Sequence, residues 1–208
     1  MTDEAIECRL ESRAGTVDED QALVCAARND TEAAGRLYDK HYGAIRNYIY
    51  HCTLDRTATD DLTSNVFLAA FRHLRRYQWR QIPFRAWLYR IATNEVRMYY
   101  RRQKKTATVS FQTEVDAGQE RIDRLEATEP CAGDSLAATE EYHLLHEALL
   151  QLKLKYRTVI ILRYFEDKAI AEISGITRRR QGTVKSQLHR GLAQLQDILI
   201  RRGVLPSW

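Results

Sequence analysis

Proline and glycine are scarce in this sequence, with three Pro and nine Gly among 208 residues. All-β folds with many tight turns need more of both, so long helices are expected instead. No window holds 18 or more consecutive apolar residues, and the acidic start of the chain lacks the apolar segment of a secretory signal. We therefore expect a cytoplasmic protein with no membrane insertion.

Sites for metals, cofactors and catalysis are also lacking. The four cysteines, at positions 8, 25, 52 and 131, form no C-x-x-C pair, which argues against a zinc site or a disulfide framework. The six histidines form no ligand pattern, although His143 and His146 share one helix face. No phosphate-binding loop or nucleophile elbow is present. We expect no metal, no cofactor and no enzymatic activity, and a redox role for Cys131 stays open.

Charge is abundant but unevenly placed. Residues 72–105 carry eleven Lys and Arg against one acidic residue, and residues 153–202 carry twelve against four. Between them, residues 106–141 carry nine acidic residues against two basic ones, and residues 1–20 are acidic too. Two basic blocks separated by an acidic one predict two contacts with a polyanion.

Apolar residues recur at helical spacing along most of the chain, and no segment alternates like a strand. The sequence thus predicts an all-α fold of two small helical domains joined by a flexible acidic linker. Thr59 or Asp60 is expected to cap a helix starting at Asp61, and Pro83 suits the first turn of the next. The predicted parts are an acidic tail at 1–19, domains at 20–105 and 137–208, and the linker at 106–136.

The second domain contains the pattern of a helix-turn-helix. A short helix at 168–176 precedes a longer one at 181–200 whose first turns are polar. Lys185 and His189 share a face with Ser186 and Arg190, opposite the apolar stripe of Val184, Leu188, Leu192, Leu195 and Leu199. Such side chains can read bases in the major groove, with Gln187 suited to adenine and Thr183 to a phosphate.

The alternative is an ordinary solvated face, and this helix alone does not decide between the two. The run Arg178, Arg179 and Arg180 favours the polyanion, because like charges so close together repel one another otherwise.

The basic block of the first domain mixes arginines with aromatic residues. Trp79 lies in a segment interrupted by proline and is flanked by Arg76, Arg80 and Arg85, as expected where single-stranded bases stack. Phe71, Phe84 and Trp87 are assigned to the core instead, and for Trp79 both readings stay open. On the following helix, one face carries Arg90, Asn94, Arg97 and Arg101.

The chain resembles the bacterial extracytoplasmic function (ECF) sigma factors of RNA polymerase. "DDLTSNVFLAAFRHLRRYQW" and "PFRAWLYRIATNEVRMYYRRQKK" resemble sigma region 2, and "LKLKYRTVIILRYFEDKAIAEI" and "GTVKSQLHRGLAQL" resemble region 4. The resemblance implies binding to core RNA polymerase, through its largest-subunit clamp helices and its flap region. It also implies promoter DNA as a partner, both duplex and non-template single strand, and an anti-sigma factor.

The resemblance also assigns roles to residues. Those implied to bind core polymerase are Asp60, Asp61, Leu62, Asn65, Val66 and Phe67. Those implied to melt and read the minus-ten element are Arg76, Tyr77, Trp79, Arg80, Arg85, Arg90, Asn94, Arg97 and Arg101. Those implied at the minus-thirty-five element are Arg178, Arg179, Arg180, Thr183, Lys185, Ser186, Gln187, His189 and Arg190.

The chain departs from the family pattern in three places: Ser64-Asn65 replaces Gln-Glu, Lys153 replaces Pro, and Arg178 replaces the Gly of the helix-turn-helix turn. A non-Gly residue in a left-handed turn costs about 1 kcal/mol. The rival functions are a stand-alone helix-turn-helix regulator that binds only duplex DNA, and an RNA-binding or antitermination module. The basic, aromatic first domain argues against the duplex-only regulator, which needs no strand-trapping loop.

Overall fold

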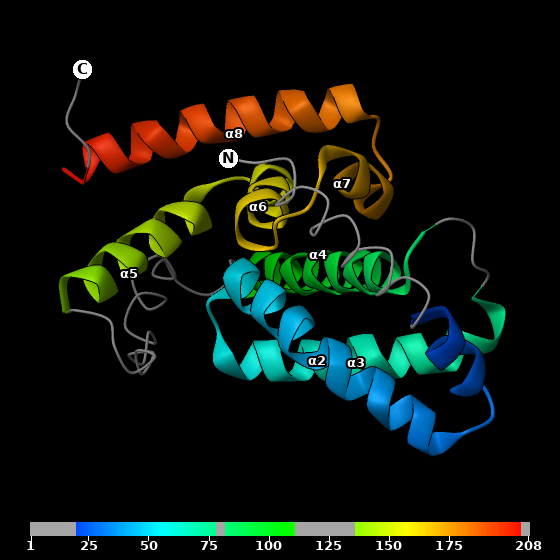
Figure 1. Ribbon diagram of the computed structural model, residues 1–208. Helices are drawn as coiled ribbons and strands as arrows, with labels where there is room; N and C mark the ends of the chain where they lie inside the picture. Colours follow the sequence, from blue (N-terminus) through cyan, green and yellow to red (C-terminus); the bar gives the residue numbers. More distant parts are fainter. Residues whose placement is uncertain (1–19, 78–81, 111–135, 205–208) are drawn as a thin grey trace.

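The computed structural model describes residues 20–77, 82–110 and 136–204, and every regular element in these ranges is helical, which confirms the predicted fold class (Figure 1). A helical stretch over 20–26 comes first. The other elements are α2 (Thr31–Thr53), α3 (Arg56–His73), η1 (Leu74–Arg76), α4 (Phe84–Ser110), α5 (Leu136–Gln151), α6 (Leu154–Ile160), the π-helical η2 (Ile161–Phe165), α7 (Ile170–Thr177) and α8 (Gln181–Arg201).

Helix α3 starts earlier than the sequence predicts. The side chain of Asp55 accepts a hydrogen bond from the backbone N–H of Ala58 (2.9 Å), so the helix begins at Arg56 rather than at Asp61. Thr59 is fully buried inside the helix, and its hydroxyl donates to the carbonyl of Asp55 (2.7 Å). The expected cap at Thr59 or Asp60 is therefore wrong, because an equally good capping residue precedes them.

Helix α4 follows Pro83 directly, and the N–H of Trp87 donates to the carbonyl of Pro83 (3.1 Å). The helix runs to Ser110, so residues 106–110, predicted as the start of the linker, are helical. Helix α5 begins at Leu136, one residue before the predicted domain boundary. The rest of the linker, the acidic tail over 1–19 and Cys131 lie outside the described residues.

In the second domain, a glycine allows α8 to pack closely against α6. A Cβ atom on Gly191 would lie 3.0 Å from Cδ1 of Ile160 and 3.1 Å from Cβ of Tyr156. Gly191 is buried at this crossing, whereas Leu192, predicted for the apolar stripe, is exposed. The contact face of α8 is thus centred on Val184, Leu188, Gly191 and Leu195, and a glycine inside a helix marks the close approach.

Helix α4 lies in the middle of the molecule, with α2 and α3 on one side and α6, α7 and then α8 on the other (Figure 1). The buried apolar residues of both domains form one connected cluster, which runs from Val24 to Leu195. The two helical domains therefore pack against each other, although the sequence suggests only a tether between them.

Candidate nucleic-acid interface

The first three turns of α8 display a row of polar and basic side chains. Thr183, Lys185, Ser186, His189 and Arg190 are all exposed, while the opposite face is anchored in the domain core. Helix α7 and the turn before α8 present this row as the second helix of a helix-turn-helix. The arrangement can place these side chains in a DNA major groove.

Gln187 stands apart from this row. Only 9% of its surface is exposed, and its Oε1 atom has no hydrogen-bond partner among the described residues. It does not project from the outer face of α8, which does not suit the predicted contact with adenine. Together with Ser186, Arg190 and Lys155 it lines a hollow of about 310 Å³ between α6 and α8. Lys155 is a cation beside the recognition helix that the sequence reasoning did not single out.

The three arginines of the turn lie at the start of α8, with Arg178 and Arg180 exposed and Arg179 half-buried. Arg178 has φ 55° and ψ 41°, so a non-Gly residue occupies the left-handed position of this turn. The turn is closed by the N–H of Arg178 and the N–H of Arg179, which both donate to the carbonyl of Ser174. The hydroxyl of Ser174 in turn donates to the carbonyl of Arg179 (2.5 Å).

On α4, the residues predicted to contact the minus-ten element differ in exposure and in their hydrogen bonds. Asn94 and Arg101 are exposed and Arg97 is half-buried. Arg90, however, donates from Nη2 to the carbonyl of Gly175 in α7 (2.6 Å). Burial and the nearby positive charge of Arg178 lower the pKa of Arg90. A predicted minus-ten residue and a predicted minus-thirty-five residue are thus neighbours, each on a different domain.

Further polar contacts join the two domains. Buried Arg157 of α6 donates from Nη1 to the carbonyl of Cys52 (2.7 Å) and to the hydroxyl of Tyr100 (2.8 Å). The hydroxyl of Tyr89 donates to the carboxylate of Glu166, and burial raises the pKa of both groups. Buried polar groups of one domain thus find hydrogen-bond partners in the other.

Two histidines meet at the same boundary, His51 of α2 and His146 of α5. Nδ1 of His146 lies 2.8 Å from the carbonyl of Tyr142, which can only accept, so this nitrogen carries the proton. Nε2 of neutral His146 then accepts from Nδ1 of His51, 2.8 Å away. Burial and His146 lower the pKa of His51 to about 4, and burial lowers the pKa of His146 as well.

The segment before α4 was predicted to trap a single strand. Arg76 and Arg85 are exposed at its two ends, while Trp79 and Arg80 lie outside the described residues. Tyr77 is buried, and its hydroxyl donates to the carbonyl of Ile82 (2.7 Å). Tyr77 therefore ties the two ends of the segment together, which does not suit direct contact with DNA.

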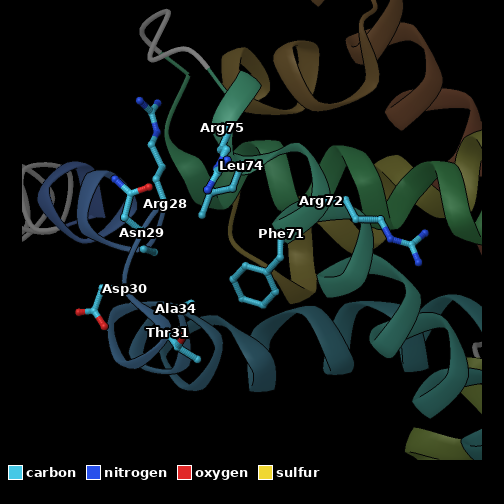
Figure 2. Close-up of a pocket in the computed structure, with 10 residues that line it drawn as sticks. Arg28, Asn29, Asp30, Thr31, Ala34, Phe71, Arg72, Leu74 and Arg75 are labelled. Carbon is cyan, nitrogen blue, oxygen red and sulfur yellow. The ribbon is translucent and has the colours of Figure 1, made fainter.

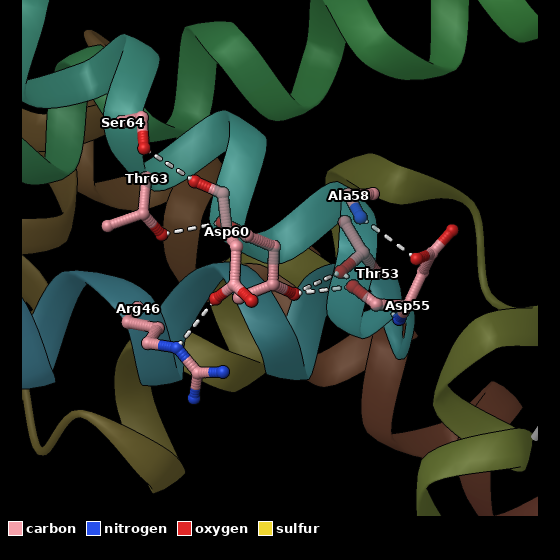
Figure 3. A network of polar contacts seen from close by, with 8 residues as sticks. Arg46, Thr53, Asp55, Ala58, Asp60, Thr63 and Ser64 are labelled. Carbon is pink, nitrogen blue, oxygen red and sulfur yellow. Dashed lines mark hydrogen bonds and ion pairs between the residues drawn. The ribbon is translucent and has the colours of Figure 1, made fainter. Parts of the chain in front are cut away.

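The predicted polymerase-binding segment also divides into two faces. Asp60, Asp61 and Asn65 are exposed on α3, whereas Leu62, Val66 and Phe67 are buried in the domain core. Nε of Arg46 in α2 donates to Oδ1 of Asp60 (2.8 Å), as Figure 3 shows.

Leu68 was missed: 53% of its surface is exposed, and it follows Asp61 and Asn65 along the outer face of α3. An exposed large apolar side chain between polar ones is typical of a protein-binding face. Its helical spacing from Asp61 could have identified it.

Within the described ranges, no three His, Cys, Asp or Glu side chains gather as a metal site would require. His143 and His146 do not act as a ligand pair, because His146 is bonded to Tyr142 and His51. Among the described helices none is both long and apolar enough to cross a membrane.

Comparison with protein families places two sigma-factor regions on this chain. Sigma-70 region 2 matches residues 37–106, and sigma-70 region 4 matches residues 142–195. Curated relatives are the ECF RNA polymerase sigma factors BldN of Streptomyces coelicolor (28% identical, covering 84% of this chain and 63% of the relative) and SigW of Bacillus subtilis (26%, covering 83% and 91%). A third is SigL of Mycobacterium tuberculosis (28%, covering 86% and 96%).

Two solved structures share the fold. The sigma factor RpoE, in complex with the anti-sigma factor NepR from Bartonella quintana, aligns with a TM-score of 0.63 at 20% identity and covers 79% of this chain and 95% of its own. CnrH, in complex with the cytosolic domain of CnrY, aligns with a TM-score of 0.62 at 23% identity, covering 88% and 97%.

Proposed function

Because this chain belongs to the ECF family of RNA polymerase sigma factors, we propose that it binds core RNA polymerase and directs it to promoters through exposed faces of α3, α4 and α8. The polymerase supplies the chemistry, and this chain supplies recognition and strand separation in the cytoplasm. The observation that carries the proposal is the exposed row on α8, in a chain that also holds a second basic surface on α4.

In this proposal, α8 reads the minus-thirty-five element. Lys185 and Arg190 can donate to guanine, while Ser186 and His189 contact neighbouring bases. Arg178, Arg179, Arg180 and Thr183 bind phosphates beside them and set the register. Val184, Leu188, Gly191 and Leu195 fix the helix to its domain, so the readers are held on a rigid element.

The exposed part of α4 contacts the upstream edge of the minus-ten element. Arg97, Asn94 and Arg101 can do so as they stand, but Arg90 must first release the carbonyl of Gly175. Full contact with the minus-ten element therefore requires Arg90 to leave α7, and a movement of α7 away from α4 would release it. We propose that binding to core polymerase supports this separation, because it holds the two domains on different parts of a larger surface.

For polymerase binding, the outer face of α3 is the contact: Asp61, Asn65 and Leu68 dock on the clamp helices of the largest subunit. Leu62, Val66 and Phe67 support this face from inside the domain. The second domain takes the flap region. An anti-sigma factor is a further partner, in line with the solved complexes of RpoE and CnrH.

The test is transcription from a promoter library by core polymerase with and without this chain. We expect sequence-selective initiation only when the chain is present. A protein that protects duplex DNA from cleavage but neither binds core polymerase nor starts transcripts is the stand-alone regulator instead.

A further inference from the structure

Residues 20–28 precede α2 and have no role among those assigned above. They comprise the helical stretch over 20–26 and the start of the turn that follows it, and they lie before the part of the chain that matches sigma-70 region 2. Val24 of this 20–28 segment is buried in the core cluster. Its two charged residues Asp20 and Arg28 are connected to the residues that lead into α4.

Asp20 is a buried acidic residue with two partners on α2. Only 5% of its surface is exposed. Its Oδ1 atom lies 3.0 Å from Nζ of Lys40, and its Oδ2 atom lies 3.3 Å from Nε2 of His41. Burial by itself raises the pKa of Asp20, but the contacts with His41 and Lys40 outweigh it and lower that pKa. A buried carboxylate stays ionised only beside such partners, so these contacts fix residue 20 against α2.

His41 connects Asp20 to the first residue of α4. The His41 ring is buried, and its centroid lies 5.6 Å from that of Phe84. Phe84 is buried as well and packs edge-on against Tyr77, with 5.7 Å between the ring centroids. The first turn of α4, which bears the exposed Arg85 of the predicted minus-ten residues, therefore packs on a ring that Asp20 holds in place.

Arg28, at the other end of the 20–28 segment, contacts the same tyrosine. Nη2 of Arg28 donates to the carbonyl of Tyr77 (2.8 Å). Arg28, Leu74 and Arg75 line one hollow, and Figure 2 shows the Arg28 side chain extending on the side of Leu74 and Arg75. The backbone that runs from α3 through η1 to Tyr77 is therefore fixed to the turn before α2.

Tyr77 is thus influenced by both charged residues of the 20–28 segment. Arg28 binds its backbone, while burial and the negative charge of Asp20 raise the pKa of its hydroxyl to about 12. The hydroxyl stays protonated at neutral pH and donates to the carbonyl of Ile82 (2.7 Å). Asp20 and Arg28 therefore act on the same residue, Tyr77, which leads from η1 toward α4.

We propose that Asp20 is a positioning residue for promoter opening: through His41 and Tyr77 it holds the start of α4 in the arrangement that receives a separated strand. The inference rests on the proposed function and adds to it a residue that is itself buried away from DNA. A surface that is already ordered in the free chain costs less free energy to order when a strand binds. Loss of the Asp20 contacts should therefore weaken binding of a separated strand more than binding of a duplex.

The experiment compares two affinities of polymerase holoenzyme formed with the full chain. One is for duplex promoter DNA at low temperature, where the strands stay paired, and the other is for the same promoter with its non-template strand already single-stranded. Asp20→Asn removes the charge and keeps the shape of the side chain. We expect its duplex affinity to stay within about twofold of wild type and its affinity for the separated strand to fall about tenfold. Asp20→Glu keeps the charge and should recover most of the strand affinity.

Three further variants separate positioning from general loss of stability. Val24→Ala removes buried apolar volume from the same helical stretch, so it should lower thermal stability and leave the ratio of the two affinities unchanged. Asp39→Asn removes the same charge from an exposed position on α2 and should bind both DNAs like wild type. Lys40→Met removes one partner of Asp20 and leaves His41, so it should shift the ratio in the same direction by a smaller factor, which keeps the test available if Asp20→Asn does not fold.

The inference is overturned if the charge-removing variants weaken binding to both DNAs by one common factor, because Asp20 then only stabilises the domain. It is also overturned if Asp20→Asn binds both DNAs as Asp39→Asn does. Failure of the proposed function is recognised separately, because the wild-type holoenzyme would then select no promoter at all.

Discussion

The start of α8 and the exposed face of α4 carry similar side chains, yet the structure treats them differently. On α8 the arginine and lysine readers are open to solvent, and the turn before them is closed within its own domain. On α4 the first basic residue, Arg90, is bonded to α7. A basic face therefore does not by itself indicate a surface ready for DNA, because a half-buried arginine can satisfy a carbonyl of the neighbouring domain instead.

The largest effect is expected from Arg157→Ala, which removes four hydrogen bonds to the carbonyls of Cys52, Leu150 and Leu152 and the hydroxyl of Tyr100. Leaving these acceptors buried and unpaired should lower the free energy of unfolding by about 2–4 kcal/mol. Urea unfolding measures this decrease in the free energy of unfolding, and the variant Lys153→Ala, at an exposed position, is the control. Equal stability of the two variants would mean that the domains are not packed together in solution.

The next prediction concerns pH and the pair His51 and His146. Their pKa values are lowered in the packed structure, that of His51 to about 4 from an ordinary value of 6.5. The contribution of this contact to the free energy of unfolding is thus fully present above about pH 6.5 and is lost as the pH falls toward 4. At pH 5 the loss should be about 2 kcal/mol for His51.

The titratable neighbours of the pair are Tyr142 and His143 of α5, and Phe165 covers it from η2. Unfolding free energies between pH 5 and 7.5 measure the effect. His146→Gln should flatten the pH dependence, and the same change at exposed His73 should leave it intact. An unchanged slope in His146→Gln would assign the pH dependence to other groups.

A smaller effect is expected from Arg90→Ala, which removes one charged hydrogen bond between the domains. We expect the packed form to lose about 1–2 kcal/mol and the radius of gyration in solution scattering to increase. Arg101→Ala removes the same charge from an exposed position on α4 and should leave the radius unchanged. Identical scattering from both variants would show that Arg90 does not hold the domains together.

The smallest effect is expected from Arg178→Gly, which relieves the left-handed conformation at φ 55°. Stability should rise by about 1 kcal/mol or less, since glycine also has more freedom in the unfolded chain. Affinity for duplex DNA should fall, with a salt slope shallower by about one phosphate. Thermal unfolding and salt-dependent binding separate the two consequences. A loss of stability would mean that the arginine side chain supports the turn.

The sequence predicts the features that arise from residues close together in the chain. It does not reveal contacts between residues that are far apart in the chain. Helices follow from local periodicity, and the exposed face of α8 follows from the same pattern. The start of α3 was misplaced because Asp55, Thr59 and Asp60 are all good caps. Only the structure shows that Asp55 accepts from the N–H of Ala58, with Thr59 buried inside the helix. The contact of Arg157 with Cys52 joins residues 105 apart in sequence, so no local pattern reveals it.

The sequence also failed to predict which side chains of a helix face the core and which face solvent. The resemblance named Leu62, Val66 and Phe67 as contacts, but these residues form the core, and the exposed apolar residue is Leu68. On α8, buried Gln187 was grouped with the readers, and Leu192 was assigned to the contact that Gly191 makes. In each case the helical period was correct, and the choice of face required the packing partner.

We propose that this chain directs polymerase to promoters through side chains on α8. The most direct measurement is sequencing of transcripts made by core polymerase with the wild-type chain, and then with Arg190→Ala, from templates randomised at the upstream element. We expect a defined upstream preference with the wild-type chain and about a tenfold loss of preference at one position with the variant. Equal preference with both chains, or no preference with either, would contradict it.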